Sequence, residues 1–454
     1  MGTPGRHTTG TAPIGVRPGM SHGAIGEFVL PSSLHPLTGK IALPGSKSVT
    51  HRAYIAAALA RGKSRISGDL LCDDTQITRK ALESMGAVFQ KVPDGIDVLG
   101  FGTSPRSPRE VIYLGQSGTS LRLLMSLALL TPSSMAFSGE KRLLERPIQP
   151  LLEALQSLGA NIVCRQSGEL IEVGRGSGLG GAIDISGNIS SQFISSLLIV
   201  GPLLEKGLQL RIVPPIVSRP YIDLTIDVMQ HFGITVEETP DGFAVEGGQT
   251  YRPREFRVEA DLSTASYFWA AAAISGGTIV TPGVPKETCQ CELAFLELLE
   301  RMGCRVTRTD SSVTVHGQEL RGIDADLRHI PDQVPTLAVL GALAQGPTRI
   351  SGVRHLRWKE SDRLACLQQE LEKLGIKIQE TEDGLTIASG PIDQGNVLLD
   401  SHSDHRLAMS FALLGLRSAQ IRLRDPECVS KSFPNFWTTW TNLVNGISSD
   451  KWGE

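Results

Sequence analysis

The chain has 454 residues, of which 41% are apolar and 20% charged, as in ordinary soluble globular proteins. Its 44 Lys and Arg nearly balance 47 Asp and Glu, and the net charge of −3 excludes the basic excess typical of nucleic-acid and membrane-surface binding. No apolar run reaches the length of a membrane-spanning helix. We therefore expect a cytoplasmic protein of two or three domains whose basic sites are local clusters.

The chain begins with residues 1–27, which are rich in Gly, Pro, Thr and His and lack the apolar core of a signal peptide. We expect this segment to be a disordered tail. Further along, seven scattered cysteines favour reduced thiols, and the pair Cys289 and Cys291 has no other metal ligands nearby. Since the chain also lacks a P-loop and a dinucleotide-binding glycine fingerprint after a strand, we expect neither a metal nor another cofactor.

The first predicted helix lies in the stretch "LPGSKSVTHRAYIAAALA", which starts at Leu43. It is typical of a strand end, a Pro-Gly turn and an alanine-rich helix with Lys47 and Arg52 near its N-terminus. The helix dipole disfavours cations at that end. A bound anion would offset this cost, so the stretch indicates an anion site.

Similar small-residue helices recur along the chain at intervals of about seventy residues, starting near Gly118, Ser190, Ser263, Asp332 and Ser403. A second helix in each interval is predicted to end at a C-cap glycine followed by a strand. These glycines are Gly86, Gly159, Gly233, Gly303, Gly375 and, at the end of the chain, Gly446. We expect six α/β units, the last of which is completed by strands from the chain's start, "GEFVLPSS" and "KIALPG".

Six units of this size predict two bodies of three units each, with the chain crossing between them near Gly45 and near Asp261. The first, discontinuous domain is expected to comprise residues 28–46 and 262–454, and the second residues 47–261. Polar residues gather at the predicted helix N-termini. If these termini face a common interdomain cleft, they form a strong anion site.

The stretch "RWKESDRLACLQQELEKLG" predicts a helix with a leucine stripe, with Lys359 and Arg363 on one face of its first turn and Glu360 beside them. Other candidates have ordinary interpretations when taken singly. Asp332, Ser190 and Ser191 could be helix caps, His405 a core histidine, Tyr221 a packing residue, and Arg146 and Lys431 surface residues. Their shared position on repeated units favours a site.

The motifs together resemble the 5-enolpyruvylshikimate-3-phosphate synthase family from about Glu27 to Trp440. In the family's order they are "LPGSKSVTHRA", "GQSGTSLR", "ERPIQPL", "SSQF", "VSRPYIDLT", "HIPDQVPT", "RWKESDRL", "SDHRLAM" and "KSFPNF". The resemblance implies two globular domains, each of three βαβαββ units, with the active site in the cleft between them. It also implies transfer of the carboxyvinyl group of phosphoenolpyruvate to the 5-hydroxyl of shikimate 3-phosphate, with release of phosphate, in the pathway to chorismate and the aromatic amino acids.

The family's functional residues carry over to matching positions. The resemblance implies that shikimate 3-phosphate is bound by Lys47, Ser48, Arg52, Ser190, Ser191, Gln192, Ser218, Tyr221, Asp332 and Lys359. It implies that phosphoenolpyruvate is bound by Lys47, Gly118, Arg146, Gln192, Arg363, His405, Arg406 and Lys431. We expect Asp332 and Glu360 to move protons and Lys47 and Lys431 to lie near the developing charge. We also expect a monomer that closes on its substrates.

Three positions depart from the family's usual pattern. Gln116 replaces the usual Asn before the glycine loop, Leu123 replaces a frequent Pro, and His355 replaces a frequent Asn. The first two lie beside the region where glyphosate competes with phosphoenolpyruvate, so we expect altered glyphosate sensitivity.

Three alternatives stay open. The sister enzyme, UDP-N-acetylglucosamine 1-carboxyvinyltransferase, usually has a reactive Cys where this chain has Lys141. A non-catalytic relative, or a module of a larger shikimate-pathway protein, is disfavoured because the charged site residues are all present. An RNA-end-processing enzyme built from related units is disfavoured by the balanced charge.

Overall fold

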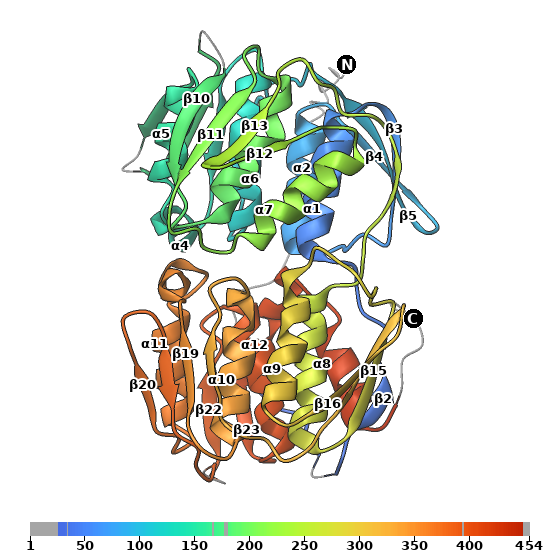
Figure 1. Cartoon of the computed structure of the whole chain (residues 1–454), viewed down its shortest axis with the longest axis vertical. Coiled ribbons are helices and arrows are strands. Elements are labelled where there is room, and N and C mark those ends of the chain that lie inside the picture. The colour runs from blue at the N-terminus through green and yellow to red at the C-terminus, as the bar shows by residue number, and fades with distance from the viewer. Residues whose placement is uncertain (1–25, 34, 166–167, 177–179, 393–394, 448–454) are drawn as a thin grey trace, which may run out of the picture.

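The computed structural model describes residues 26–33, 35–165, 168–176, 180–392 and 395–447, which form two halves stacked along the longest axis of the molecule (Figure 1). Each half has its own hydrophobic core. One core draws its residues from 49–258 and the other from 30–41 and 262–443. We call them the continuous half and the split half, and propose that they are the second and first domains expected from the sequence.

Helices and strands are interspersed along the whole described part of the chain. The continuous half contains, in chain order, α1 (Lys47–Leu59), β3 (Arg61–Ser67), α2 (Asp73–Ser84), β4 (Val88–Val92), β5 (Gly95–Phe101), β6 (Ile112–Tyr113), α3 (Gly118–Met125), η1 (Ser126–Leu130), β7 (Met135–Ser138), α4 (Lys141–Glu145), α5 (Gln149–Ser157), β8 (Asn161–Arg165), β9 (Leu170–Gly174), β10 (Gly181–Ser186), α6 (Ser191–Val200), η3 (Gly201–Leu203), β11 (Leu208–Val213), α7 (Pro220–His231), β12 (Glu237–Thr239), β13 (Gly242–Val245) and β14 (Glu255–Arg257).

The split half joins the start of the chain to its end. It contains β1 (Glu27–Val29), β2 (Thr38–Lys40), α8 (Leu262–Ser275), β15 (Thr278–Pro282), η4 (Cys291–Ala294), α9 (Phe295–Arg301), β16 (Arg305–Arg308), β17 (Ser312–His316), β18 (Asp324–Asp326), η5 (Pro331–Gln333), α10 (Val334–Leu343), β19 (Thr348–Ser351), η6 (Arg354–Trp358), α11 (Arg363–Glu372), β20 (Ile378–Glu380), β21 (Leu385–Ile387), β22 (Val397–Asp400), α12 (His405–Ala412), η7 (Leu413–Leu416), β23 (Ile421–Arg424), η8 (Pro426–Lys431) and α13 (Phe436–Val444).

The strands of the described residues form small mixed sheets that repeat one pattern. In β10-β11-β13-β12, for example, β10 and β11 are parallel and the other neighbours are antiparallel. The same order recurs in β6-β7-β9-β8, β14-β3-β5-β4, β2-β15-β17-β16 and β18-β19-β21-β20, and a three-stranded sheet has the order β22-β23-β1. The α/β class with repeated units is therefore confirmed.

The predicted completion of the last unit is half right. β1 pairs with β23 in the last sheet, but β2 pairs instead with β15. The reason lies in the two crossings. The strand just before each crossing pairs within the half that the chain is leaving. β2 remains in the split half before α1 enters the continuous half, and β14 pairs with β3 before α8 enters the split half.

The chain's start also differs from the expectation. Of the predicted tail, residues 1–27, the first 25 lie outside the described residues. Its last residue, Glu27, is the first residue of β1, because its backbone pairs with Arg424 of β23.

The predicted C-cap glycines are confirmed by their backbone angles. Gly86, Gly159, Gly233, Gly303 and Gly375 have φ between 78° and 111°, a region that side chains with a Cβ rarely adopt. Gly446, with φ 76°, follows the end of α13 in the same way. The first five of these helices therefore stop where a glycine lets the chain turn into a strand.

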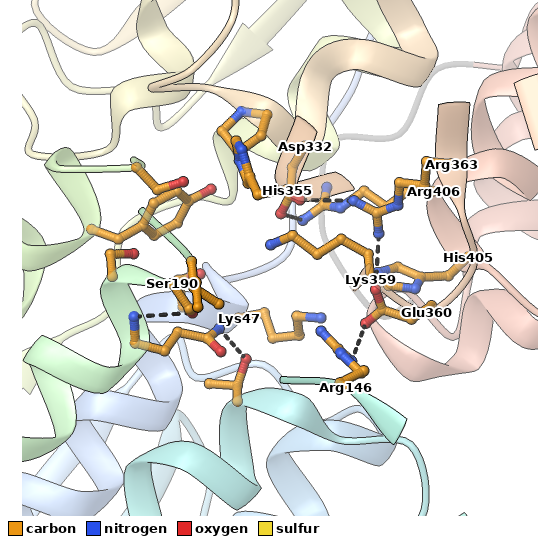
Figure 2. Close-up of a pocket in the computed structure, with 18 of the residues that line it drawn as sticks. Lys47, Arg146, Ser190, Asp332, His355, Lys359, Glu360, Arg363, His405 and Arg406 are labelled. Atoms are coloured by element: carbon orange, nitrogen blue, oxygen red, sulfur yellow. Dashed lines mark hydrogen bonds and ion pairs between the residues drawn. The ribbon is translucent and has the colours of Figure 1, made fainter. Parts of the chain in front are cut away.

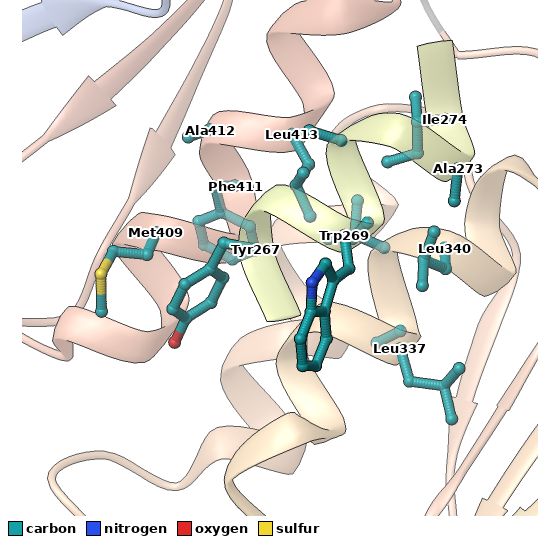
Figure 3. Packing of buried hydrophobic residues seen from close by; sticks show 14 of the residues in the cluster. Tyr267, Trp269, Ala273, Ile274, Leu337, Leu340, Met409, Phe411, Ala412 and Leu413 are labelled. Carbon is teal, nitrogen blue, oxygen red and sulfur yellow. The ribbon is translucent and has the colours of Figure 1, made fainter. Parts of the chain in front are cut away.

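The central helices of each half are buried on nearly all sides. In the split half, α8, α10 and α12 pack together through Trp269, Leu337 and Phe411, and alanines along α8 let its neighbours approach closely (Figure 3). A helix buried in this way exposes mainly its ends, so its N-terminus remains accessible to a ligand.

The two crossing segments run side by side between the halves. Gly45 and Ala260 form an antiparallel bridge, and the Gly45 position admits no side chain, since a Cβ there would lie 1.9 Å from the carbonyl oxygen of Gly68. Asp261 accepts the backbone N–H of Lys47 at 2.9 Å and that of Thr264 at 2.7 Å, so one carboxylate caps α1 of one half and α8 of the other. Within the described part of the chain, no helix has the length and apolarity needed to cross a bilayer.

Candidate active site

A cavity lies between the two halves (Figure 2). Its wall contains six cationic side chains and two carboxylates, Asp332 and Glu360. The lining residues are Lys47, Ser48, Arg52, Thr119, Arg146, Ile189, Ser190, Ser191, Gln192, Ser218, Tyr221, Pro331, Asp332, His355, Lys359, Glu360, Arg363, His405 and Arg406. The cavity thus brings together all of the residues predicted for the site except Gly118 and Lys431, which lie just behind its wall.

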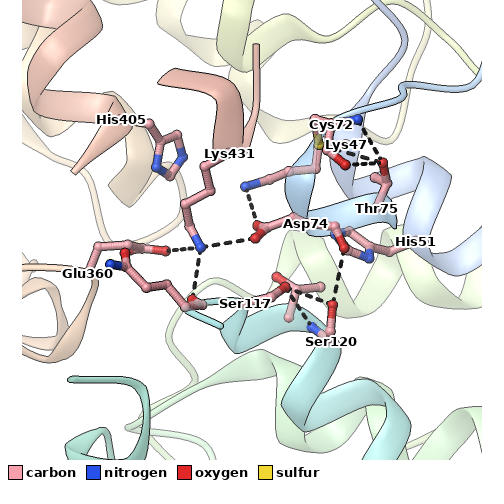
Figure 4. A network of polar contacts seen from close by, with 12 residues as sticks. Lys47, His51, Cys72, Asp74, Thr75, Ser117, Ser120, Glu360, His405 and Lys431 are labelled. Carbon is pink, nitrogen blue, oxygen red and sulfur yellow. Dashed lines mark hydrogen bonds and ion pairs between the residues drawn. The ribbon is translucent and has the colours of Figure 1, made fainter. Parts of the chain in front are cut away.

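Lys47 opens α1, whose N-terminus is capped by Ser46 and Asp261. Its ammonium lies 3.0 Å from one carboxylate oxygen of Asp74, and the ammonium of Lys431 lies 3.0 Å from the other (Figure 4). Burial disfavours the charge on Lys47, but Asp74 and Glu360 together raise its pKa above the ordinary value. Both lysines are therefore held next to the cavity in a defined geometry.

Asp332 holds two arginines at the cavity wall. Its carboxylate accepts hydrogen bonds from Arg363 and from Arg406, both at 2.9 Å, and it lies in η5, before α10. Burial opposes ionisation, yet Arg406, Lys359 and Arg363 hold the pKa of Asp332 well below its usual range. Asp332 is consequently an ionised acceptor. It makes no side-chain cap to α10, so the ordinary helix-cap interpretation is wrong.

Glu360 is the second carboxylate of the wall. One oxygen lies 3.6 Å from Arg146 and 3.8 Å from Lys431, and the other lies 3.1 Å from Arg363. Arg146, Arg363 and Lys431 outweigh the opposing effect of burial and hold the pKa of Glu360 well below its ordinary value. Glu360 is also ionised, and it faces residues from both halves.

The predicted helix around Lys359 begins later than expected. Asp362 caps α11 by accepting the backbone N–H of Ala365 at 3.2 Å, so the helix starts at Arg363. Lys359 and Glu360 precede the helix and follow η6, and they do not share its first turn with Arg363. This placement lets both side chains reach the cavity. Burial lowers the pKa of Lys359 to about 8.

One end of the cavity is formed around Arg52 and Tyr221. The Arg52 guanidinium donates to the Thr225 hydroxyl at 2.7 Å and to the backbone oxygen of Ser48 at 2.8 Å. Burial lowers the pKa of Arg52 to about 10. The Tyr221 hydroxyl crosses between the halves to donate to Glu292 at 2.5 Å.

A row of small polar residues lines the neighbouring wall. Ser190 caps α6, and Ser191 is that helix's buried first residue. The Gln192 side chain is fixed by Arg122, which donates to its oxygen at 2.7 Å, and by its own donation to Thr119 at 3.0 Å. Ser218, with φ 53°, donates its backbone N–H to Arg328 of the split half at 3.0 Å.

Gly118 belongs to the site by contact. A Cβ at this position would lie 2.7 Å from Nη1 of Arg146, so only glycine leaves room for that guanidinium. His405, the first residue of α12, is buried with neither ring nitrogen hydrogen-bonded, and burial, assisted by Lys47, lowers its pKa well below the ordinary value. A neutral imidazole therefore lies beside Glu360 and the two lysines.

The three departures from the family's pattern occupy different settings. Gln116 donates its side chain to Glu140 at 2.7 Å, while its backbone oxygen accepts from Lys431 at 2.8 Å. Leu123 packs in the core of the continuous half. Only His355 lines the cavity, and its Nε2 is buried without a partner.

Sequence reasoning missed two carboxylates that hold the site's cations. Asp74 lies in the acidic start of α2, "CDDTQ", which is typical of an ordinary helix start, and no local signal separates it from Asp73. Asp404 belongs to the "SDHRLAM" motif but was not among the residues assigned to the site. It caps α12 and also accepts from Nε of Arg363 at 2.8 Å. The second role depends on a residue 41 positions away and leaves no trace in the local sequence.

The comparisons with known proteins all match one family over nearly the whole chain. The family model described as EPSP synthase (3-phosphoshikimate 1-carboxyvinyltransferase) matches residues 32–440. The 3-phosphoshikimate 1-carboxyvinyltransferase of Methanoculleus marisnigri is 43% identical over 418 residues, covering 89% of this chain and 97% of the relative. That of Syntrophobacter fumaroxidans is 41% identical, covering 90% and 99%. The solved EPSP synthase of Acinetobacter baumannii matches with a TM-score of 0.77 at 29% identity, covering 92% of this chain and 97% of that one. The chain belongs to the EPSP synthase family.

Proposed function

We propose that this protein transfers the carboxyvinyl group of phosphoenolpyruvate to the 5-hydroxyl of shikimate 3-phosphate and releases phosphate. The observation that carries the proposal is the excess of cations around one cavity, six against two carboxylates, in a member of this family. The two substrates bring two phosphates and two carboxylates together. Only a dense group of Lys, Arg and helix N-termini offsets the repulsion among these groups.

We place shikimate 3-phosphate against the continuous half. Ser48, Arg52, Ser190, Ser191, Gln192, Ser218 and Tyr221 all line this side of the cavity, and Lys47, Asp332 and Lys359 adjoin them. Phosphoenolpyruvate lies where Arg146, Arg363 and Arg406 converge, with Gly118, His405 and Lys431 behind. Lys47 and Gln192 then contact both substrates.

The ionisation of the two carboxylates determines their roles. Because Asp332 and Glu360 are both ionised, one of them accepts the 5-hydroxyl proton during addition, while the ammonium of Lys47 or Lys431 protonates the methylene carbon of phosphoenolpyruvate. During the elimination that follows, the methyl carbon returns a proton to that lysine, and the departing phosphate takes up the proton held by the carboxylate. Lys47 and Lys431, held by Asp74, lie beside the developing charge and stabilise it. No metal or other cofactor takes part in this proposal.

The test is phosphate release from phosphoenolpyruvate with shikimate 3-phosphate or UDP-N-acetylglucosamine as acceptor. We expect release only with shikimate 3-phosphate, and strongly reduced release in the Asp332→Ala variant. Release only with the sugar nucleotide would assign the chain the sister activity, and release with neither, from a folded protein, would refute the proposal. We further propose a cytoplasmic monomer, which gel filtration with light scattering tests for its oligomeric state.

A further inference from the structure

Arg142 of α4 and Arg146, the residue that follows this helix, reach across from the continuous half to the backbone of the split half. Arg142 donates from Nη2 to the carbonyl oxygen of Arg357 at 3.0 Å, and from Nε to those of Lys359 and Glu360, both at 3.2 Å. Arg146, four residues later, donates from Nε to the carbonyl oxygen of Trp358 at 3.1 Å. Four consecutive carbonyls, those of residues 357–360, are thus bound by a short helix of the opposite half and the residue that follows it. We call residues 357–360 the carbonyl segment.

The carbonyl segment carries two residues of the site, Lys359 and Glu360, and covers the end of η6. Its first two residues are the last two of η6, and Lys359 and Glu360 lie between η6 and Asp362, the cap of α11. Carbonyls at the end of a helix lack partners within the helix, and a guanidinium with several donors satisfies them well. The backbone that positions Lys359 and Glu360 therefore receives hydrogen bonds from the other half of the molecule.

Arg142 differs from Arg146 in its place relative to the cavity. Arg146 lines the cavity and approaches Glu360, whereas Arg142 is outside the lining, half-buried at the contact between the halves. All three hydrogen bonds that Arg142 donates to the split half go to backbone oxygens. These hydrogen bonds can therefore fix the position of the carbonyl segment, whereas Arg142 itself does not line the cavity where a ligand would bind.

We propose that Arg142 is a positioning residue that orders the carbonyl segment only when the two halves are closed, so that closure itself brings Lys359 and Glu360 into place. In an open molecule these carbonyls would face water and the segment would lose a three-point attachment. The reaction would then be confined to the closed state, in which water is also excluded. The kinetic part of this inference rests on the proposed function, and its structural part does not.

The first experiment compares Arg142→Met with Lys141→Met, a matched control on the same helix whose side chain is 92% exposed. Hydrogen exchange is measured by mass spectrometry on peptides covering residues 354–362, without substrates and with both present. We expect faster exchange there in Arg142→Met, by about threefold or more, and exchange like wild type in Lys141→Met. Equal exchange in wild type and Arg142→Met under both conditions would overturn the proposal.

The second experiment measures kcat and KM on the same variants. We expect Arg142→Met to lose about tenfold to hundredfold in kcat/KM, mainly through kcat, because a catalytic group displaced by about 1 Å costs a factor of this order. Arg142→Lys should recover part of the loss, since a lysine keeps the charge but cannot bind three carbonyls at once. A value of kcat/KM for Arg142→Met within twofold of that for Lys141→Met would overturn the proposal.

The outcomes separate this inference from the proposed function. An inactive wild-type protein would refute the proposed function, while the exchange measurement would still decide the role of Arg142. If Arg142→Met does not fold, as judged by circular dichroism, Arg142→Lys carries both measurements with the same criteria.

Discussion

Asp332 binds two of the six cations of the cavity wall, Arg363 and Arg406. Each of these arginines would be costly to bury alone, and the carboxylate compensates both. The sequence identified all three residues through motifs, but their mutual contacts became apparent only in the folded chain.

The Asp332→Asn substitution should lower kcat by about 100-fold to 10,000-fold, the usual contribution of a general base, because an amide of the same size accepts no proton. The matched control is Asp326→Asn, which changes a surface carboxylate paired with Arg328. The control should retain kcat within about twofold. An Asp332→Asn variant with wild-type kcat would remove this carboxylate from the proton transfers.

Lys359, which we propose binds shikimate 3-phosphate, should make the affinity for this substrate depend on pH. Its pKa of about 8, lowered by burial, means that the free protein loses this positive charge above that pH. The KM for shikimate 3-phosphate should therefore rise above pH 8, by up to about tenfold per pH unit. Measuring KM between pH 7 and 9.5 tests this.

The matched variant is Lys359→Arg, which should lack this rise because arginine stays protonated throughout that range. The effect on stability has the opposite sign. Between pH 8 and the ordinary lysine pKa of about 10.4, the unfolded chain binds more protons, so Lys359's contribution to the free energy of unfolding rises with pH. An identical KM profile in the two proteins would contradict the assignment.

At the scale of the elements, the predictions succeeded where periodicity and end signals agree. The leucine stripe of α11 and the glycine after it determined the helix and its end, but the start was misplaced because two of the four residues before Arg363 were read as helical. Asp362 provides the cap, and a side chain that accepts one backbone N–H decides a helix start more strongly than a pair of similar charges.

The helices α1 and α8 share a cap, so one substitution should weaken both. Asp261→Ala removes the acceptor for the backbone N–H groups of Lys47 and Thr264, and should lower the free energy of unfolding by about 2 kcal/mol at roughly 1 kcal/mol per cap. The control Ser46→Ala removes a single cap of α1, to Val49, and should cost about half as much. Urea unfolding of both variants checks this, and equal losses would show that Asp261 does not serve both helices.

At the scale of the whole molecule, Asp74 joins the two halves by binding Lys47 of its own half and Lys431 of the other. Lys431 and the other cations hold the pKa of Asp74 well below its ordinary value, against the effect of burial. This contribution to stability is complete above the ordinary Asp pKa of about 3.9 and is lost as the pH falls through the folded value.

The Asp74→Asn substitution should lower the free energy of unfolding at pH 7 by about 3–5 kcal/mol, because it leaves two buried ammonium groups facing each other without the carboxylate that lies between them. We also expect a larger radius of gyration in small-angle scattering, since the repulsion separates the halves. Asp73→Asn, which alters the exposed neighbouring carboxylate, is the control and should cost less than about 1 kcal/mol. A closed Asp74→Asn protein of wild-type stability would contradict this role.

The sequence by itself determined the repeated units, the class of the fold, the C-cap glycines and nearly every side chain of the cavity, because these depend on local signals or on motifs. Only the tertiary structure decided which sheet receives β2, where the chain exchanges strands at the crossings, and which carboxylates face which cations. Asp74, Asp404 and Arg142 carry ordinary local signals, and their roles arise from partners up to several hundred residues away in the chain. Pairings of this kind are set by the packing of the two halves, and the free energy that selects them has no counterpart in any short stretch of sequence.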